Sequence, residues 1–491
     1  MTDAARTVAA LGHVLRSADL LVELRGAEDV AVGGVSHDSR AVGPDDLFLA
    51  WVGTGVDAHD FVGEAVRKGA AAAVVERAVD VDVPQLVVRN GRRAAALAAD
   101  AVLGSPSRDM LVVGVTGTNG KTTTSLLSRH LLAAEMKTAV IGTLGVVDDD
   151  GVRPGTEGLT TPGPVQVAVW LRDLADGGTA AVVLEASSHA LEQHRLDGVA
   201  FDIGAFTNLT QDHLDYHGDM EAYRRSKARL VDLVAADGTI VVNADDRAWA
   251  GLATGGRRRV SFGIDAEADV RATGLEMGPA GTTFTLHAEG RSHEARLPLV
   301  GRYNVHNALA ALCVGRGAGV PMERLVARLA EASPVAGRLE AVVTEPFTVF
   351  VDFAHTPDAL ANALAAVKPL TRGRLISVFG AGGDRDPTKR APMGAAVGAV
   401  ADVVIVTSDN PRTEDPDAII DDVVEGLAGV EYLRFADRRE AIDAAIAMAE
   451  PGDTIVLTGK GHESYQVIGT EKLPFDEHRI VRDALRARGK A

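Results

Sequence analysis

The sequence is poor in several features, and each scarcity removes a class of protein. Its single cysteine, Cys313, excludes an internal disulfide, and the Ala-rich run around it favours a small apolar core residue. Acidic residues outnumber basic ones by 68 to 50, and the resulting charge of −18 disfavours nucleic acid as a partner. No apolar run approaches the roughly 20 residues of a membrane helix, and the first residues lack the apolar core of a signal peptide. We therefore expect a cytoplasmic enzyme or binding protein with no membrane partner.

What the sequence does contain is enough apolar material for several cores. The chain has 491 residues, of which 46% are hydrophobic, and it exceeds the usual size of one domain. Changes in pattern predict three α/β domains in series, covering residues 1–105, 106–336 and 337–491. The Gly-, Ser- and Pro-containing stretch "LGSPSRD" is typical of a linker between the first two.

Short Val- and Ile-rich runs predict the strands of these domains. In the second domain, "MLVVGVT", "TAVIGT", "AAVVLEAS", "FDIGAFTN" and "GTIVVN" alternate with helical stretches, which favours a parallel sheet covered on both faces. Residues 269–300 predict an antiparallel excursion from that sheet. In the third domain, "FTVFVDFA", "RLISVFG", "DVVIVTS" and "DTIVLTG" predict a second parallel, Rossmann-like sheet.

The stretch "GVTGTNGKTTTSLL" predicts a phosphate-binding loop (P-loop). It follows a strand and opens a helix, so its backbone N–H groups and the helix N-terminus can hold phosphate oxygens. Lys121 would reach the β- and γ-phosphates, and the Thr122 hydroxyl would bind Mg²⁺. The common pattern requires glycine at position 115, where this chain has Val115, so the loop is a variant form. The expected ATP-binding residues of the loop are Gly117, Thr118, Asn119, Gly120, Lys121, Thr122 and Thr123.

This variant, "TGTNGKTT", resembles the ATP loop of the Mur ligase and folylpolyglutamate synthetase superfamily, and further motifs match its MurE type in order along nearly the whole chain. These enzymes activate a carboxylate as an acyl phosphate, which an amine then attacks. The resemblance implies an N-terminal uridine-nucleotide domain, a central P-loop ATPase domain and a C-terminal domain for the added amino acid.

A second metal site is implied around Glu185, which ends a strand next to the phosphate-loop strand and is well placed for Mg²⁺. Lys227 as an ammonium would repel the metal. In the family the matching lysine is carbamylated by CO₂, so Glu185, His213 and carbamylated Lys227 (N6-carboxylysine) would hold a second Mg²⁺, with Lys121 completing the catalytic set. Alone, Lys227 and His213 would be ordinary surface residues.

The ATP site continues into the third domain. "GRYNVHNALAAL" resembles the element on the adenine side, with Asn304 and Asn307, although asparagines near a helix start are usually caps. Arg338, Asp352 and His355 resemble groups that reach ATP when the C-terminal domain closes, which predicts a hinge around Gly337.

The expected partner is UDP-MurNAc-L-Ala-D-Glu. Its implied contacts come from "VSHDSR", "WVGT", "GLTTPG" and "SSHALEQHR". The residues are Ser39, Arg40, Thr54, Thr160, Thr161, Ser187, Gln193 and Arg195. Thr54 stands where some relatives carry histidine.

The turn "SDNPR" predicts which amino acid is added. Asp-Asn-Pro alone is typical of a turn. The resemblance assigns Arg385, Asp409, Asn410, Pro411, Arg412, Gly459 and Glu463 to the amino-acid pocket. meso-Diaminopimelate is lysine plus a carboxylate, so Arg412 would bind that group bidentately and Glu463 would accept from the distal ammonium. A dinucleotide role for "GAGGDR" is disfavoured, because Arg385 replaces the third glycine.

We therefore predict a monomeric ligase that adds meso-diaminopimelate to the D-glutamate γ-carboxylate with ATP and Mg²⁺. One alternative is the same reaction with L-lysine, and another is a ligase of the MurF or folylpolyglutamate type. A third, from a different class, is a non-catalytic P-loop protein with an acquired sugar-nucleotide site.

Overall fold

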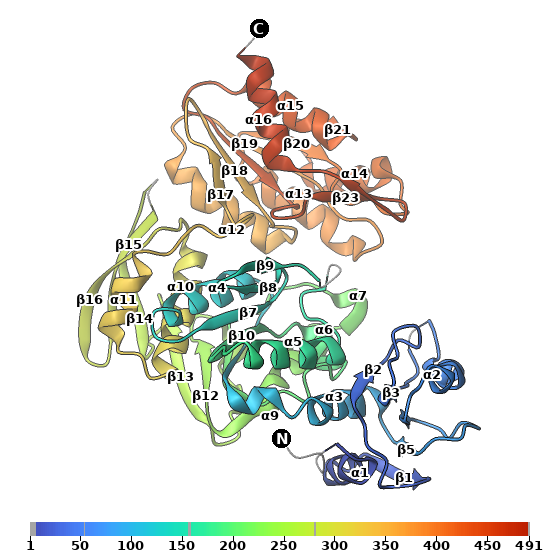
Figure 1. Ribbon diagram of the computed structural model, residues 1–491. Coiled ribbons are helices and arrows are strands. Elements are labelled where there is room, and N and C mark those ends of the chain that lie inside the picture. Colours follow the sequence, from blue (N-terminus) through green and yellow to red (C-terminus); the bar gives the residue numbers. More distant parts are fainter. Residues whose placement is uncertain (1–5, 54, 156–158, 279–280, 490–491) are drawn as a thin grey trace.

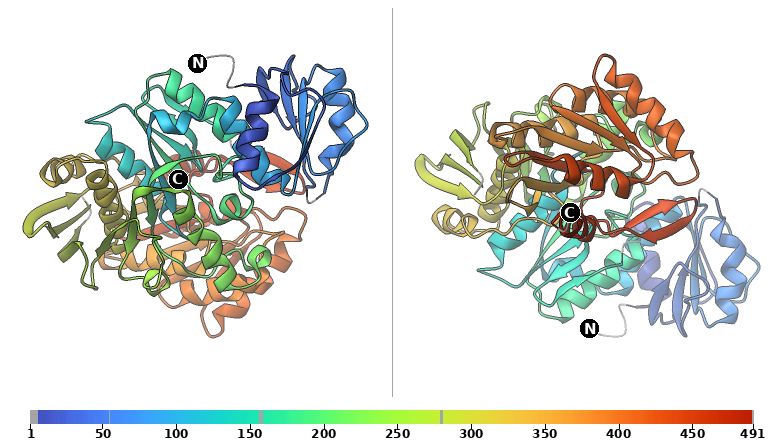
Figure 2. Two further views of the ribbon diagram at one scale, coloured as in Figure 1. Left: turned by 90° about the horizontal axis from the view of Figure 1, so that it is seen from below. Right: turned by 90° about the horizontal axis from the view of Figure 1, so that it is seen from above.

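The computed structural model describes residues 6–53, 55–155, 159–278 and 281–489. These residues form sheets of five, eleven and six strands and one separate hairpin (Figure 1). Each large sheet carries its own helices, and the three α/β parts follow one another along the chain (Figure 2). The expected three-part α/β architecture is confirmed. No helix among the described residues combines the length and apolar character needed to cross a bilayer.

The N-terminal part is a five-stranded sheet in the order β1-β5-β4-β3-β2, in which only β1 runs antiparallel to its neighbour. Its strands are β1 (Leu21–Arg25), β2 (Gly34–Ser36), β3 (Asp46–Leu49), β4 (Ala72–Val75) and β5 (Gln85–Val88). Its helices are α1 (Val8–Ser17), α2 (Val62–Arg67) and α3 (Gly91–Val102). Helix α3 is rich in alanine, which lets it lie close to the sheet and to the central part.

The central sheet has the order β16-β15-β14-β13-β12-β11-β6-β10-β7-β8-β9. The strands from β7 to β14 are parallel to their neighbours, and both edges finish in antiparallel pairs. The excursion predicted near residue 270 is confirmed as β14–β16, whereas β8 and β9 were not predicted. The strands are β6 (Leu111–Thr116), β7 (Thr138–Gly142), β8 (Gly145–Asp148), β9 (Gly151–Arg153), β10 (Ala181–Glu185), β11 (Phe201–Phe206), β12 (Val234–Asn243), β13 (Arg258–Gly263), β14 (Val270–Gly278), β15 (Gly281–Ala288) and β16 (Arg291–Leu297).

Helices cover both faces of this sheet, as its buried Val- and Ile-rich strands require. One core packs against α4 (Lys121–Leu132), α10 (Arg302–Gly317) and α11 (Met322–Leu329). The other packs against α5 (Pro164–Asp176), α6 (Ser188–Glu192) and α9 (Leu230–Leu233). Two further helices, α7 (Leu214–His217) and α8 (Met220–Ala228), follow β11 and carry residues to the carboxyl edge of the sheet.

The C-terminal sheet has the order β17-β18-β22-β19-β20-β21, parallel except for β17. The four strands predicted for it are confirmed as β18, β19, β20 and β22. Its strands are β17 (Glu340–Val343), β18 (Thr348–Asp352), β19 (Leu375–Phe379), β20 (Val403–Thr407), β21 (Tyr432–Phe435) and β22 (Thr454–Thr458), with a hairpin of β23 (Tyr465–Ile468) and β24 (Glu471–Pro474). Its helices are α12 (Pro357–Val367), α13 (Arg390–Gly398), α14 (Pro416–Val424), α15 (Arg438–Met448) and α16 (Glu477–Arg488).

The N-terminal and central parts meet where α3 packs against α5 and the loop before β11. A cavity of about 200 Å³ at this junction is lined by Val14, Leu97, Asp100 and residues 197–200, among others. Ser105 donates a hydrogen bond of 2.7 Å to the Asp100 carboxyl group. Burial nevertheless raises the pKa of Asp100 to about 6. The junction therefore carries a carboxyl group whose charged form is disfavoured.

Replacing Asp100 with asparagine should stabilise the protein at pH 8 and leave it nearly unchanged at pH 4. Because the native pKa lies above the unfolded one, the native state binds more protons between about pH 4 and 6, and stability falls as pH rises through that window. Asparagine removes this loss while keeping an acceptor for Ser105. We expect a gain of about 1–2 kcal/mol at pH 8, measured by calorimetric unfolding at both pH values. An equal gain at both values would contradict the explanation.

Candidate active site

A cleft of about 480 Å³ lies between the carboxyl edges of the central and C-terminal sheets. It brings together most of the residues predicted from the sequence, although they come from segments up to 345 positions apart (118 to 463). From the central part these are Thr118, Asn119, Gly120, Lys121, Thr122, Thr123, Thr160, Glu185, Ser187, Arg195, His213, Lys227 and Asn307. From the C-terminal part they are Arg338, Asp352, His355, Arg385, Asp409, Asn410, Arg412, Gly459 and Glu463.

The remaining predicted residues do not line this cleft. Gly117, Thr161, Asn304, Gln193 and Pro411 lie in the segments that form it but are absent from its wall. Ser39 and Arg40 belong to the N-terminal part. There the Ser39 hydroxyl donates to Glu64, and the exposed Arg40 pairs with Asp38 at 2.8 Å. Thr54 lies outside the described residues.

The phosphate loop has the backbone geometry that its glycines predict. Gly117 (φ +148°) and Gly120 (φ +84°) both have positive φ. A Cβ atom at Gly117 would collide with the Thr207 hydroxyl, and one at Gly120 would collide with the Asn307 side chain. The Lys121 ammonium donates to the carbonyl oxygens of Gly117 and Thr118, both at 2.9 Å. The lysine therefore lies along the loop, where an anion could draw it away from the carbonyls.

Glu185 lies at the centre of a buried polar group at the end of β10. Its carboxylate accepts hydrogen bonds from the hydroxyl groups of Thr122 (3.0 Å) and Thr143 (3.1 Å) and from the Thr143 amide (3.0 Å). Burial raises the pKa of Glu185, whereas the charge of Lys121 opposes the rise. A dehydrated carboxylate beside two hydroxyl groups is an oxygen-rich environment of the kind that Mg²⁺ prefers.

Lys227 is 1% exposed, so it is no surface lysine. Its amine donates to the Gly117 carbonyl oxygen at 2.8 Å and lies 4.4 Å from the centre of the Tyr223 ring. Burial, followed by the charge of Lys121, holds its pKa well below the ordinary value. A neutral lysine amine is nucleophilic, which is the form that reacts with CO₂. The described residues contain no cluster of three or more His, Cys, Asp or Glu side chains able to hold a metal.

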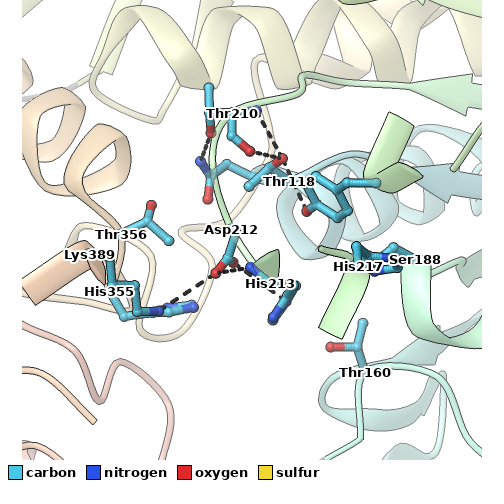
Figure 3. A network of polar contacts seen from close by, with 12 residues as sticks. Thr118, Thr160, Ser188, Thr210, Asp212, His213, His217, His355, Thr356 and Lys389 are labelled. Atoms are coloured by element: carbon cyan, nitrogen blue, oxygen red, sulfur yellow. Dashed lines mark hydrogen bonds and ion pairs between the residues drawn. The ribbon is translucent and has the colours of Figure 1, made fainter. Parts of the chain in front are cut away.

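His213 has a left-handed backbone conformation (φ +55°) just before α7, which turns its ring toward the cleft. Its backbone amide donates to the Asp212 carboxylate at 2.9 Å, and its ring nitrogen lies 3.5 Å from the same group. Lys389 of the C-terminal part reaches Asp212 at 3.6 Å (Figure 3). His355 lies on the same side of Asp212 as Lys389. Asp212 thus connects His213, a predicted metal ligand, to Lys389 of the C-terminal part.

Two hydrogen bonds also connect the central and C-terminal parts. The Asn119 amide donates to the Asp358 carboxylate at 3.2 Å, and the Arg338 guanidinium donates to the Thr122 hydroxyl at 3.2 Å. Arg338 also stacks on the Phe353 ring at 4.6 Å. The Asp352 carboxylate accepts the backbone amides of Leu339 and Ala354, which fixes the segment that carries Arg338.

Another wall of the cleft follows the end of β10. The buried Thr161 hydroxyl donates to the Glu185 carbonyl oxygen at 2.6 Å and accepts from the Ser187 amide at 3.0 Å. Arg195 donates to the Thr161 carbonyl oxygen at 2.8 Å and to the Gln193 side chain at 2.7 Å. Burial lowers the pKa of Arg195, so this cation is partly dehydrated and suited to binding a carboxylate.

The turn "SDNPR" contributes Asp409, Asn410 and Arg412 to the wall of the cleft. The hairpin β23–β24 holds it, because the Arg412 amide donates to the Val467 carbonyl oxygen at 3.0 Å. The Arg412 guanidinium donates to the Gly383 carbonyl oxygen at 2.6 Å. Burial lowers the pKa of Arg412, and so does the charge of nearby Arg385. Two like charges at one end of a cleft favour an anionic ligand group.

Several cleft residues were missed in the sequence. Lys389, Asp212 and Thr143 line the cleft and Lys460 lies buried beneath it, and no spacing marks these four residues before the two sheets are placed face to face. Lys460 does stand between Gly459 and Glu463, which were assigned to the amino-acid pocket, but its own contacts depend on distant partners.

Comparison with known proteins follows the same three parts. Residues 31–111 match the Mur ligase family catalytic domain, 115–315 the Mur ligase middle domain, and 337–461 the Mur ligase glutamate ligase domain. A Bacillus licheniformis protein is 40% identical over 469 residues, which cover 94% of this chain and 96% of the relative. This chain belongs to the Mur ligase family.

Several relatives of this Mur ligase share one name. The Bacillus licheniformis protein and one from Synechococcus elongatus (43% identical, covering 95% of this chain and 96% of the relative) are both named UDP-N-acetylmuramoyl-L-alanyl-D-glutamate–2,6-diaminopimelate ligase. A solved structure of a protein of that name is 34% identical, with a TM-score of 0.69, and covers 95% of this chain and 98% of its own. The Thermotoga maritima MurF ligase, 20% identical with a TM-score of 0.66 and matched over 95% of this chain and 100% of its own, shares the fold.

Proposed function

We propose that this Mur ligase is a MurE-type enzyme of peptidoglycan precursor synthesis. It joins meso-diaminopimelate to the D-glutamate γ-carboxylate of UDP-MurNAc-L-Ala-D-Glu and converts ATP to ADP and phosphate. The observation that carries the proposal is the Arg385–Arg412 pair in the same cleft as the phosphate loop. Relatives at 40–43% identity bear the corresponding name.

Each part of the chain has a proposed role. Residues 1–105 bind the uridine nucleotide through Ser39, Arg40 and Thr54, residues 106–336 bind ATP, and residues 337–491 bind the amino acid. The protein is a cytoplasmic monomer in this proposal. Because the N-terminal residues lie outside the cleft wall, they contact only the distal part of a long substrate.

In the first step a γ-carboxylate oxygen attacks the γ-phosphorus of ATP, and ADP leaves. The loop N–H groups, Lys121 and Arg338 stabilise the phosphate charge, while Arg195 orients the glutamate. Asn304 and Asn307 support the adenine side, and Asp352 and His355 complete the nucleotide site. The amine of diaminopimelate then attacks the acyl carbon, phosphate leaves, and the amide forms.

The residues present suit two magnesium ions. Thr122 would hold one, and Glu185, His213 and Lys227 as its carbamate would hold the other. The buried Lys227 amine fits this modification, because its lowered pKa favours the neutral form and an ammonium cannot react with CO₂. When bound, the metal ions would neutralise charge between the γ-phosphate and the substrate carboxylate.

The test compares two amino acids on the full-length protein. With UDP-MurNAc-L-Ala-D-Glu, ATP and Mg²⁺, meso-diaminopimelate should give the tripeptide product by mass spectrometry, with one ADP released per product. L-Lysine should give far less product. Preference for lysine would replace this proposal by the lysine-adding alternative. ATP hydrolysis that depends on both organic substrates would reject the non-catalytic alternative.

A further inference from the structure

The side chain of Lys460 is completely buried beneath the end of the cleft where Arg412 and Glu463 lie. Its ammonium lies 2.8 Å from Asn410 Oδ1, 3.1 Å from Glu463 Oε2 and 3.3 Å from Asp409 Oδ1. Two of these contacts are hydrogen bonds, to Asn410 and Glu463, and the Asp409 carboxylate adds an ion pair. A buried charge without such partners would be strongly destabilising, so this arrangement is tightly constrained.

Lys460 sets the orientation of the Asn410 amide. The Asn410 Oδ1 atom accepts from the Lys460 ammonium and from the Val467 backbone amide at 2.9 Å. The other end of the amide, Nδ2, consequently faces Glu463 and donates to its Oε2 atom at 3.0 Å. A reversed amide would place its two donors against two donors, which excludes the alternative.

Glu463 is thereby held through one oxygen only. Its Oε2 atom accepts hydrogen bonds from both Lys460 and Asn410. No described residue donates a hydrogen bond to its Oε1 atom. Glu463 lines the cleft, so the second oxygen is an acceptor available to a ligand. Burial alone would raise the pKa of neighbouring Asp409, but the charges of Lys460 and Arg438 hold it below its ordinary value.

The same asparagine also supports the cationic side of this pocket. The Asn410 carbonyl oxygen lies 3.5 Å from the Arg412 guanidinium, which is fixed by Gly383 at 2.6 Å. The anion at Glu463 and the cation at Arg412 are therefore held at a constant separation. The same cleft contains the phosphate loop, so the chain that leads to the reacting amine supplies a third point of attachment. Three fixed points around one tetrahedral carbon distinguish its two configurations.

We propose that Lys460 is a positioning residue through which this pocket selects the configuration of the distal carbon of diaminopimelate. This inference rests on the proposed function. The distal carbon carries an ammonium for Glu463, a carboxylate for Arg385 and Arg412, and the chain that leads to the reacting amine. Exchanging its configuration swaps the charged groups between Glu463 and the arginines. Lys460 touches no ligand and acts by fixing Glu463 and Asn410.

The test measures kcat/KM for meso- and LL-diaminopimelate with the wild type, Lys460→Met and Lys472→Met. Lys472 is an exposed lysine of the adjacent hairpin and serves as the matched control. The wild type and the control should prefer the meso isomer strongly. Lys460→Met should lower the meso-to-LL ratio by about tenfold or more, the effect of misplacing one charge-assisted hydrogen bond. KM for ATP and for the UDP-linked substrate should change by less than about twofold, because their sites lie elsewhere.

A Lys460→Met enzyme that is equally impaired on both isomers has lost only stability, and that result overturns the inference. Should this variant melt below the assay temperature, Asn410→Asp provides the same test. It keeps an acceptor for Lys460 but sets an oxygen against Glu463, so the ratio should again fall. An unchanged ratio in an active variant overturns the inference alone. A wild type inactive on both isomers overturns the proposed function as well.

Discussion

Lys227→Ala should reduce turnover about a thousandfold, because losing a carbamate ligand would remove several kcal/mol of charge stabilisation between the carboxylate and the γ-phosphate. The amine is buried and its pKa lies well below the ordinary value, so it is ready for the modification. The measurement is product formation under saturating substrates, together with the mass of the intact protein, in which wild type should carry an added CO₂ in bicarbonate buffer.

Bicarbonate at high concentration should partly restore the Lys227→Ala enzyme, because a small oxyanion can enter the space left by the side chain. The control is Lys137→Ala, an exposed lysine of the same part whose ammonium donates to the Gly177 carbonyl oxygen. This variant should keep full turnover. A Lys227→Ala enzyme with near-normal kcat would remove the carbamate from the mechanism.

Arg412→Lys should raise the KM for diaminopimelate about thirtyfold and leave the KM for ATP unchanged. The arginine is anchored by Gly383 and backed by Arg385, so its planar group presents a preformed pair of donors. Lysine keeps the charge but replaces that pair with a single mobile ammonium, a loss of about 2 kcal/mol for one charge-assisted hydrogen bond. Steady-state kinetics with each substrate varied in turn gives the measurement.

Arg479→Lys is the matched control for this change, because Arg479 is an exposed residue of α16. It should alter no kinetic constant. If Arg412→Lys also leaves the KM for diaminopimelate unchanged, then Arg412 is not part of the pocket. If it raises the KM for every substrate alike, the turn acts through domain closure instead.

The fold could be predicted from the sequence because its strands are short, buried and apolar. "VVLE" and "VVIVT" are parallel strands whose pattern requires cover on both faces, and both lie in the interior of sheets. The strands β8 and β9 were missed because "GVVDDDGVR" has a mixed composition and one of the two is fully exposed. Their pairing depends on the neighbouring edge strand β7 rather than on their own pattern.

Residues of the candidate site could be predicted only where they belong to a contiguous sequence motif. The phosphate loop and "DNPR" are contiguous, so their residues could be named together before the fold was known. Lys460 and the Asp212–Lys389 pair could not be found in this way, because their significance arises from partners at distant positions. The burial of Lys227 could not be predicted either, since the sequence around it is that of an ordinary helical lysine among charged neighbours.

Arg338 couples the closure of the C-terminal part onto the central part to the binding of the nucleotide. It follows Gly337, belongs to the C-terminal part, and donates to Thr122 of the phosphate loop. Closing the two parts therefore completes the nucleotide site, and filling that site favours closure. Thermodynamic linkage then requires that the factor by which the bound amino acid raises the affinity for ATP equals the factor by which bound ATP raises the affinity for the amino acid. If the proposed assignment of the two substrates holds, ATP and the amino acid are therefore expected to bind this cleft cooperatively.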